Sequence, residues 1–292
     1  PVPAYAGLAK SLFFYGIKPK TILLGKENEY KMTYEDVVSG YTDKTVALLI
    51  TNPANPACLF IDEGELKKIV DFCIEKNIYI IYDAIFEEAP MYHNKRVEIF
   101  KLARDYKKLI KIKGFSKDIP QLSDLRSGWT ICKNTQFIDR LLELGEAVNY
   151  SNSTFLEALG IVEMTQRVNV DKGATDEVTN QYRREKAQYH NQVTTLFRNA
   201  FEYLNENDDV VEHVIYPDAG NIMYITLKVS VCNKKGVYTS HELFVYILEH
   251  ENILITPGNV FGLPLEDMSF RITISRGYDQ FMDGLRRIVE LF

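Results

Sequence analysis

Short apolar runs alternate with amphipathic stretches along the first half of the chain. Residues 46–50 (VALLI) and 78–82 (IYIIY) are apolar almost without interruption, as expected of strands that are covered on both faces of a sheet. Between them, Asp62 can cap a helix. The apolar residues of that helix recur at a spacing that places them on one face: Leu66, Ile69, Val70, Phe72 and Cys73. The pattern predicts two buried strands joined by a helix.

This alternation continues with two more strand candidates, 109–112 and 127–132, and then a helix over 136–144. Strand, crossover helix and strand in succession predict a largely parallel sheet. We therefore expect an α/β fold in which residues 1–172 form a large three-layer domain with a mostly parallel sheet.

The second half of the chain has a different order. Helices are predicted over 154–168 and over the long, charged stretch 174–206. The later elements are strands near 209–215 and over 221–227, a helix over 241–250, strands over 253–255 and 270–274, and a helix over 280–291. We expect residues 173–292 to form a long connecting helix and a smaller α+β C-terminal domain.

The charges of the chain narrow its possible partners. Of 292 residues, 34 are Lys or Arg and 40 are Asp or Glu, which gives a formal net charge of −6. The basic residues are scattered, whereas nucleic-acid binding favours clustered positive charge, so we expect no nucleic-acid partner. Because no apolar run approaches the ~20 residues that span a bilayer, we expect no membrane association.

The cysteines and histidines indicate neither disulfides nor a metal site. The four cysteines are widely spaced, unlike the close pairs of a zinc site or the dense pattern of a disulfide framework: Cys58, Cys73, Cys132 and Cys232. The five histidines also lack the spacing of metal ligands. Reduced, buried thiols in a cytoplasmic protein are the simplest interpretation.

Three polar segments follow predicted strands. Residues 52–56 carry Asn55, residues 83–86 begin with Asp83, and residues 114–118 carry Lys117. In open α/β sheets, ligands bind at the carboxyl ends of the strands, so an amide, a carboxylate and an amine are expected to converge there. Singly, each has a simpler explanation: a turn former, a strand-end cap and a solvated lysine.

These segments belong to a series of short motifs along the chain. They are Asn52-Pro-Ala-Asn-Pro56, Tyr82-Asp-Ala-Ile-Phe86, Phe115-Ser-Lys117, Arg126-Ser-Gly-Trp129, Thr256-Pro-Gly-Asn-Val-Phe-Gly262 and Phe270-Arg-Ile-Thr273. In type and order, along the whole chain, they resemble the marks of the fold-type I pyridoxal-phosphate enzymes. The resemblance is to the aspartate aminotransferase superfamily, the class I/II aminotransferases.

The resemblance implies pyridoxal 5′-phosphate as the cofactor and a role for each matching residue. Lys117 would form the Schiff base and later move a proton, and Asp83 would pair with the pyridine nitrogen. Asn55 would donate to the ring hydroxyl oxygen, and Tyr5 would stack on the ring. Phe86 stands where the family usually has a tyrosine that donates to the same oxygen. The loss of that donor would let the Schiff base keep its proton to higher pH.

Three further residues are implied by the resemblance. Ser116 and Arg126 would bind the cofactor phosphate, and Arg271 would bind the substrate α-carboxylate through a two-pronged guanidinium contact. Asn55 is also expected to take part in substrate binding. Arg126 follows Lys117 by nine positions, where the family has eight, which predicts an insertion in the phosphate loop or a displaced Arg126.

An aminotransferase acting on an amino acid and a 2-oxo acid is the first hypothesis. The alternative keeps the cofactor and changes the reaction to that of a lyase, a cyclase or an oxidase-like enzyme of amino-acid metabolism. A non-catalytic binding protein of the same fold is less favoured, because both Lys117 and Asp83 are present. A dehydrogenase is not favoured, because no glycine-rich dinucleotide fingerprint occurs.

The resemblance also implies a homodimer, since the family builds its sites at a two-fold interface. The chain begins almost at Tyr5, whereas the family has a preceding segment that supplies most of the phosphate cradle at a helix N-terminus. We therefore expect the protein to be longer than the sequence given, and this chain alone to bind the cofactor poorly.

Overall fold

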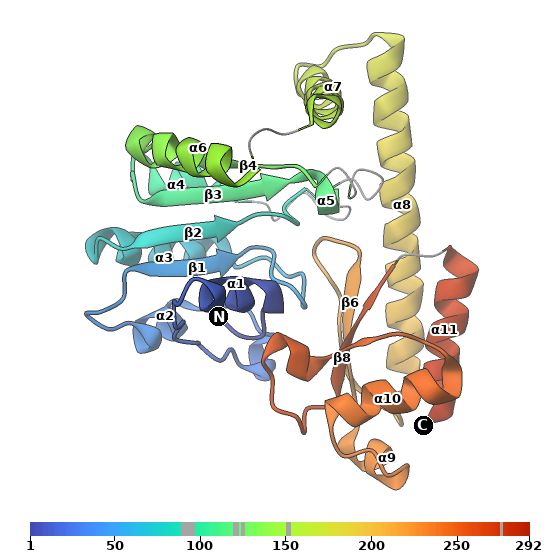
Figure 1. The fold of residues 1–292 in the computed structure, drawn as a ribbon. Coiled ribbons are helices and arrows are strands. Elements are labelled where there is room, and N and C mark those ends of the chain that lie inside the picture. Colours follow the sequence, from blue (N-terminus) through green and yellow to red (C-terminus); the bar gives the residue numbers. More distant parts are fainter. Residues whose placement is uncertain (89–96, 119–122, 124–125, 150–152, 275–276) are drawn as a thin grey trace.

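The structure is a computed structural model that describes residues 1–88, 97–118, 123, 126–149, 153–274 and 277–292. Two sheets lie one above the other in Figure 1, and the long helix α8 (Glu177–Glu206) runs beside both of them. The α/β fold with a mostly parallel first sheet agrees with the sequence-based prediction.

The first sheet has the strand order β1-β2-β3-β4. Its strands are β1 (Ala47–Thr51), β2 (Tyr79–Asp83), β3 (Leu109–Gly114) and β4 (Gly128–Cys132). The first three are parallel, and β4 is antiparallel to β3. Thr51 lies opposite Asp83, and Asp83 opposite Ile112, so the carboxyl ends of the three parallel strands meet at one edge of the sheet.

Helix α3 (Glu63–Glu75) packs on this sheet with the predicted apolar face, and all five predicted residues are buried. Asp62 occupies the N-cap position, as predicted, but its side chain accepts no hydrogen bond from the helix backbone. The remaining helices up to α8 are α1 (Ala6–Phe14), α2 (Tyr34–Gly40), α4 (Ile99–Ala103), α5 (Phe115–Asp118), α6 (Thr135–Asn149) and α7 (Thr154–Asp171), with a 3₁₀ turn at Lys26–Asn28.

Of these helices, α1, α2, α4 and α5 were not predicted from the sequence. Helix α2 had a visible signal, because Thr33 and Asp36 form a capping box in which each side chain accepts from the other's backbone N–H. Helix α1 had none, because its apolar residues surround the helix and none of its residues is buried.

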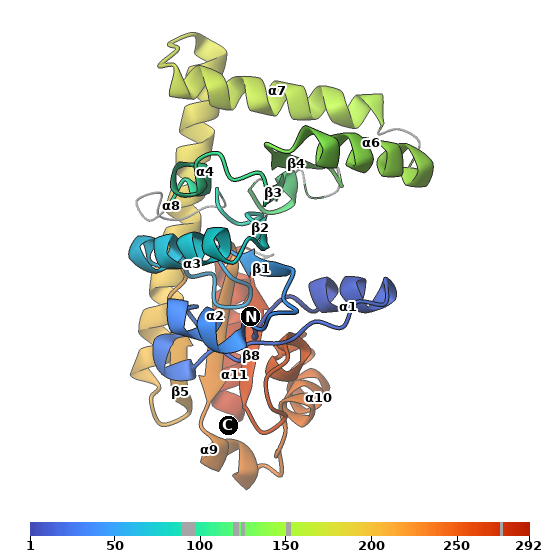
Figure 2. The same ribbon diagram turned by 90° about the vertical axis from the view of Figure 1, so that its left-hand side faces the viewer.

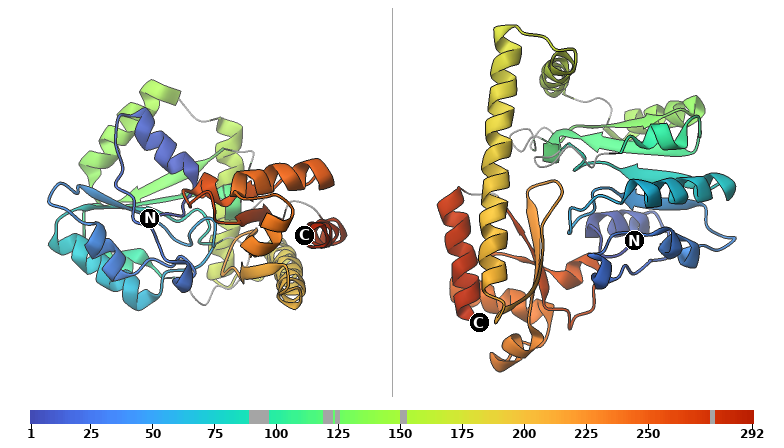
Figure 3. Two further views of the ribbon diagram at one scale, coloured as in Figure 1. Left: turned by 90° about the horizontal axis from the view of Figure 1, so that it is seen from below. Right: turned by 180° about the vertical axis from the view of Figure 1, so that it is seen from behind.

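Helix α8 joins the two sheets. It begins at Glu177 rather than at residue 174, because the Asp176 side chain accepts from Thr179 N and caps the helix there. Its 30 residues extend about 45 Å at 1.5 Å per residue. Toward its C-terminal end the buried residues Phe197, Ala200 and Leu204 pack in the core of the second sheet. Figure 3 shows α11 (Tyr278–Leu291) beside that part of α8.

The second sheet is antiparallel, with the order β5-β6-β8-β7. Its strands are β5 (Val211–Ile215), β6 (Ile222–Leu227), β7 (Thr256–Pro257) and β8 (Ser269–Thr273), and its further helices are α9 (Val229–Lys234) and α10 (Ser240–Glu251), with a 3₁₀ turn at Gly258–Phe261. The predicted strand over 253–255 is wrong, because the chain pairs with β8 only at Thr256 and Pro257.

The two sheets share part of one core. Ile215, Tyr224 and Phe261, which belong to the second sheet and its turn, are buried in the same cluster as Ile50 and Tyr82 of the first sheet. Figure 2 shows the same stacking from the side, with α6 and α7 at the end remote from the second sheet. Within the described ranges, every helix is too short or too polar to cross a membrane.

Candidate functional site

The predicted site residues gather where β1, β2 and β3 end. Asn55 lies in the loop after β1, Asp83 is the last residue of β2, and Lys117 lies in the short helix α5 directly after β3. Their order on the sheet follows from the parallel register, which aligns these three strand ends. The sequence predicted this convergence from the strand order alone.

Hydrogen bonds to Asn52 hold the loop after β1 in place. Its backbone N–H donates to Asp83 O at 2.9 Å. Its side-chain Nδ2 donates to the Tyr82 hydroxyl at 2.8 Å, and its Oδ1 accepts from Ile61 N at 2.9 Å. These bonds fasten the start of the loop that carries Asn55 to the end of β2.

Asp83 is a partly buried carboxylate. Burial raises its pKa above the ordinary value, and the hydrogen bond that Ile85 N donates to its Oδ1 at 3.1 Å opposes this shift. That bond is the only one that the described residues supply to its side chain. A cationic group placed against this carboxylate would stabilise its charged form.

Lys117 has a lowered pKa. Partial burial of the ammonium is the main cause, and the positive charges of Arg271 and Arg126 add to it. The Lys117 Nζ lies 5.8 Å from the centre of the Phe86 ring, and Phe86 is buried. An amine in these surroundings loses its proton more readily than a solvated lysine, as a nucleophile or a general base requires.

Arg271 reaches the same place from the second sheet. In β8 it lies opposite Tyr224 of β6 and Thr256 of β7. Its Nη1 donates to Asn55 Oδ1 at 3.2 Å, and its Nη2 donates to Thr256 Oγ1 at 3.4 Å. Its guanidinium also lies over the Phe261 ring, 5.3 Å from the ring centre.

The Arg271 guanidinium is positioned to receive an anion. Its Nε is buried and has no acceptor among the described residues, and burial lowers the pKa of Arg271. No carboxylate of the described chain pairs with it. Because a guanidinium only donates, it also fixes the Asn55 carboxamide with Oδ1 toward Arg271, which leaves Nδ2 to donate elsewhere.

The other predicted cofactor-binding residues make few contacts with the described part of the site. Tyr5 is the N-cap residue of α1, and its side chain is 54% exposed. Ser116 is partly buried, without a hydrogen bond from its side chain to any described residue, and Arg126 is exposed and donates to Ser123 O at 3.3 Å. Residues 119–122 and 124–125, where the predicted insertion of the phosphate loop falls, lie outside the described residues.

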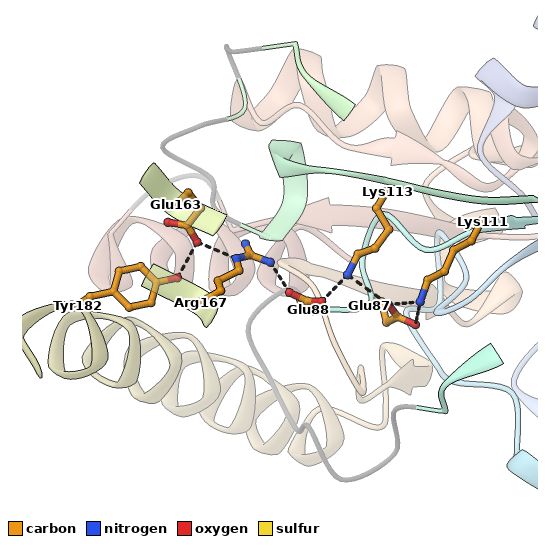
Figure 4. A network of polar contacts seen from close by, with 7 residues as sticks. All are labelled: Glu87, Glu88, Lys111, Lys113, Glu163, Arg167 and Tyr182. Carbon is orange, nitrogen blue, oxygen red and sulfur yellow. Dashed lines mark hydrogen bonds and ion pairs between the residues drawn. The ribbon is translucent and has the colours of Figure 1, made fainter. Parts of the chain in front are cut away.

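A network of mostly charged side chains links β3, the segment after β2 and two helices (Figure 4). Lys111 and Lys113 extend from β3 to Glu87, which follows the end of β2. Lys111 Nζ is 2.8 Å from Glu87 Oε2, and Lys113 Nζ is 3.2 Å from the same oxygen. All three side chains are nearly inaccessible. The network thus connects the strand before Lys117 with the segment after Asp83.

The network continues to the two long helices. Glu88 bridges Lys113 and Arg167 of α7. Glu163 accepts from Arg167 Nε at 2.8 Å and from the hydroxyl of Tyr182, on α8, at 2.6 Å. A cavity of about 590 Å³ is lined in part by Glu88, Arg167 and Tyr182, and its described lining includes none of the predicted site residues.

Some residues of the site were not found in the sequence. Thr256 accepts from Arg271, Cys58 and Asp218 join the loop after β1 to the second sheet, and Tyr224 packs edge-on against Phe261. The run Pro217-Asp-Ala-Gly220 signals a turn, but no local pattern predicts which distant loop that turn contacts.

The sequence of the chain is similar to those of a known protein family. The family model for aminotransferase class I and II matches residues 1–287. The probable aspartate/prephenate aminotransferase of Aquifex aeolicus is 25% identical over 99% of this chain and 68% of its own length. The aspartate aminotransferase of Bacillus subtilis is 23% identical over the same shares. The chain spans about two thirds of the length of these relatives.

Solved structures with the same fold agree. The aromatic aminotransferase of Pyrococcus horikoshii matches with a TM-score of 0.82 and 20% identity, over 99% of this chain and 70% of that one. A putative aminotransferase from Clostridium difficile with bound pyridoxal phosphate matches with a TM-score of 0.80 and 18% identity, over 99% and 69%. The predicted family, transferase class and cofactor are confirmed. Since the family model matches almost the whole chain, the chain belongs to the class I and II aminotransferases.

Proposed function

We propose that this chain transfers an amino group between an amino acid and a 2-oxo acid at the site formed by Asn55, Asp83, Lys117 and Arg271. The observation that carries the proposal is the pairing of Arg271 with Asn55, which leaves the buried Nε of Arg271 without an acceptor. A substrate α-carboxylate would supply that acceptor through a bidentate contact. Lys117, with its lowered pKa, lies close enough for the charge of Arg271 to affect it.

The residues fit pyridoxal phosphate. When bound, the cofactor supplies an aldehyde that takes up the amino group and a ring that delocalises the negative charge left at the substrate Cα. Asp83 is placed to hold a proton on the ring nitrogen, because its raised pKa reflects a buried carboxylate that a cation would stabilise. Asn55 Nδ2 remains free to donate to the ring oxygen, since Oδ1 is engaged by Arg271.

Lys117 is proposed as the residue that binds the aldehyde covalently and moves the proton. Its lowered pKa favours the neutral amine, which is the form that attacks a carbonyl carbon and removes a proton from Cα. The buried Phe86 ring, with its centre 5.8 Å from the Lys117 Nζ, borders one side of that amine. The same amine would then donate this proton to the cofactor carbon that carries the amino group.

We propose that Ser116 and Arg126 bind the cofactor phosphate and that Tyr5 covers one face of the ring. The exposed position of Tyr5 and Arg126 leaves room for a ligand beside them. We also propose that Phe86 faces the ring oxygen, where a phenol would donate, so that Asn55 is the main side-chain donor to that atom.

The assembly and location are also proposals. We propose a homodimer, because large apolar side chains on α1, α6 and α7 are exposed, among them Phe14, Leu142, Val148 and Phe155, and because two-fold dimers are the commonest assemblies. We propose a cytoplasmic location, which the four free cysteines support. We retain residues 1–172 and 173–292 as the proposed domains.

The substrate is proposed from the names of relatives. Aspartate and aromatic amino acids are named for the Aquifex and Pyrococcus proteins, and we propose one of these two classes for this chain. The test uses the full-length protein with pyridoxal phosphate, 2-oxoglutarate and one amino acid at a time. Release of the matching 2-oxo acid only in the presence of the acceptor supports transamination, whereas ammonia without an acceptor would favour a lyase. Lys117→Ala is the inactive control.

A further inference from the structure

Two loops from different sheets are joined directly beside the site. One follows β1 and contains Cys58 and Phe60; the other connects β5 to β6 and contains Asp218 and Ala219. The backbone N–H groups of Asp218 and Ala219 donate to Cys58 O at 2.9 and 3.3 Å. A third hydrogen bond joins the loops in the opposite direction, because the Asp218 Oδ2 accepts from Phe60 N at 3.0 Å. Figure 1 shows the β5–β6 connection reaching toward the first sheet.

All parts of this junction are buried. Cys58 is fully buried, Phe60 is 3% exposed and Asp218 is 7% exposed. A buried backbone N–H needs an acceptor, and Asp218 supplies one for Phe60. A buried carboxylate needs hydrogen-bond donors, and Phe60 N is one donor that fixes Asp218 Oδ2 at this junction.

Close packing prevents the two loops from sliding past each other. Gly220 has a φ of +89°, and a Cβ at that position would lie 2.9 Å from Cys58 Sγ and 3.1 Å from the Phe86 ring. Only glycine allows so close an approach of backbone to side chain in this conformation. Ile222, the first residue of β6, is buried with Cys58 and Phe86.

Both loops lead directly to the substrate side of the site. Asn55 precedes Cys58 by three positions in the first loop. The second loop continues into β6, where Tyr224 lies opposite Arg271 of β8. The junction at Asp218 therefore lies on the short route between the two residues whose side chains meet at 3.2 Å.

We propose that Asp218 is a positioning residue that holds Asn55 against Arg271, so that the two side chains grip a substrate carboxylate together. This role rests on the proposed function of that site. Asp218 contacts no reacting atom; it acts by fixing the loop that carries Asn55 relative to the strand that carries Arg271.

The test compares two variants of Asp218 in the full-length protein. Asp218→Ala removes the acceptor for Phe60 N, whereas Asp218→Asn keeps an oxygen that can accept. Asn55 and Arg271 would bind the substrate carboxylate equally before and during the reaction. Weakening that binding therefore raises KM and leaves kcat nearly unchanged. We expect Asp218→Ala to raise KM for the amino acid about tenfold, and Asp218→Asn to restore most of this loss. Asp209→Ala, at an exposed site before β5, is the matched control.

A second measurement separates positioning from general stability. If Asp218 acts through Asn55, Asp218→Ala on an Asn55→Ala background raises KM less than about twofold further. Equal effects on both backgrounds would overturn the proposal, as would an Asp218→Ala variant with lowered Tm and unchanged KM. If the alanine variant does not fold, Asp218→Ser replaces it in the same comparison.

Hydrogen exchange gives a readout that needs no turnover. In the cofactor-free protein, the peptide containing Phe60 should exchange faster in Asp218→Ala than in the wild type, and at the wild-type rate in Asp218→Asn. Unchanged exchange in both variants would overturn the junction itself. A wild-type protein that transaminates no amino acid would instead overturn the proposed function and the positioning role with it, whatever the exchange shows.

Discussion

Arg271 Nη1 and Asn55 Oδ1 lie 3.2 Å apart, although 216 positions separate the two residues in the chain. The contact joins the loop after β1 to strand β8 of the other sheet, and it leaves Arg271 Nε with no acceptor among the described residues. The contact thus brings the guanidinium of β8 against the loop after β1, where its Nε remains available to a carboxylate.

Replacement of Arg271 tests this arrangement directly. Arg271→Lys keeps a positive charge but loses the planar pair of donors. We expect KM for the amino acid to rise about 10- to 100-fold with a smaller change in kcat, measured by steady-state kinetics. Arg286→Lys, on the exposed side of α11, is the control and should leave both constants unchanged. Equal KM values for Arg271→Lys and the wild type would remove Arg271 from the site.

Lys117 should be the residue that binds the cofactor covalently. Its lowered pKa and its place at the end of β3 give it the reactive amine. Reduction of the full-length protein loaded with pyridoxal phosphate by borohydride, followed by peptide mapping, should place the label on Lys117. The buried Lys111 and Lys113 serve as internal controls, because both amines are engaged by Glu87. A label on another lysine contradicts the assignment.

Phe86 gives a spectroscopic prediction. A phenol at this position would donate to the ring oxygen and stabilise its negative charge, which favours loss of the neighbouring proton. Phe86→Tyr should therefore lower the pH at which the absorption of the lysine-bound cofactor changes from the protonated to the unprotonated form. Phe155→Tyr, at an exposed position on α7, should leave the titration unchanged. An identical midpoint in Phe86→Tyr would show that residue 86 does not face the ring oxygen.

The buried network predicts a large loss of stability at one carboxylate. Glu87→Gln removes the negative charge between Lys111 and Lys113 and leaves two buried ammonium groups with too little compensation. We expect the free energy of unfolding to fall by about 3–5 kcal/mol, measured by urea denaturation. Glu75→Gln removes the ion pair between Lys76 and the largely exposed Glu75. This change should alter the free energy of unfolding by less than about 1 kcal/mol. A similar small effect at both sites would contradict the role of the network.

The same network explains where the sequence was a poor guide. In β3, Lys111 and Lys113 are 3% and 6% exposed and Ile110 is also buried, whereas Ile112, between the two lysines, is 39% exposed. The two lysines can be buried because Glu87 and Glu88, in a different segment, pair with them. Local periodicity carries no information about such distant partners.

Elsewhere local patterns were sufficient. The continuous apolar runs predicted strands β1 and β2, although alternate residues of both are only partly buried, and the strand order predicted that Asn55, Asp83 and Lys117 converge. The contacts of Arg271, Thr256 and Asp218 were not predictable in this way, because they depend on how the second sheet docks against the first. The strand predicted over 253–255 was wrong for a related reason, since an apolar run becomes a strand only where it pairs with another strand.

The pKa of Lys117 makes the stability of the cofactor-free protein depend on this residue in a defined direction. The folded pKa lies below the ordinary value of 10.5, so the fold disfavours the charged amine. Below the folded pKa the amine is charged in both states, and the folded state is destabilised. As pH rises from the folded pKa toward 10.5, the unfolded chain binds more protons and stability increases.

Lys117→Met, which removes the charge and keeps a similar length, should therefore stabilise the cofactor-free protein at neutral pH. The difference in Tm from the wild type should shrink as pH rises through the folded pKa toward 10.5. Lys10→Met, at an exposed position on α1, should show no such pH-dependent difference. A Lys117→Met variant less stable than the wild type at pH 7 would show that the ammonium is not disfavoured in the fold, and the physical basis for a reactive amine at this position would be lost.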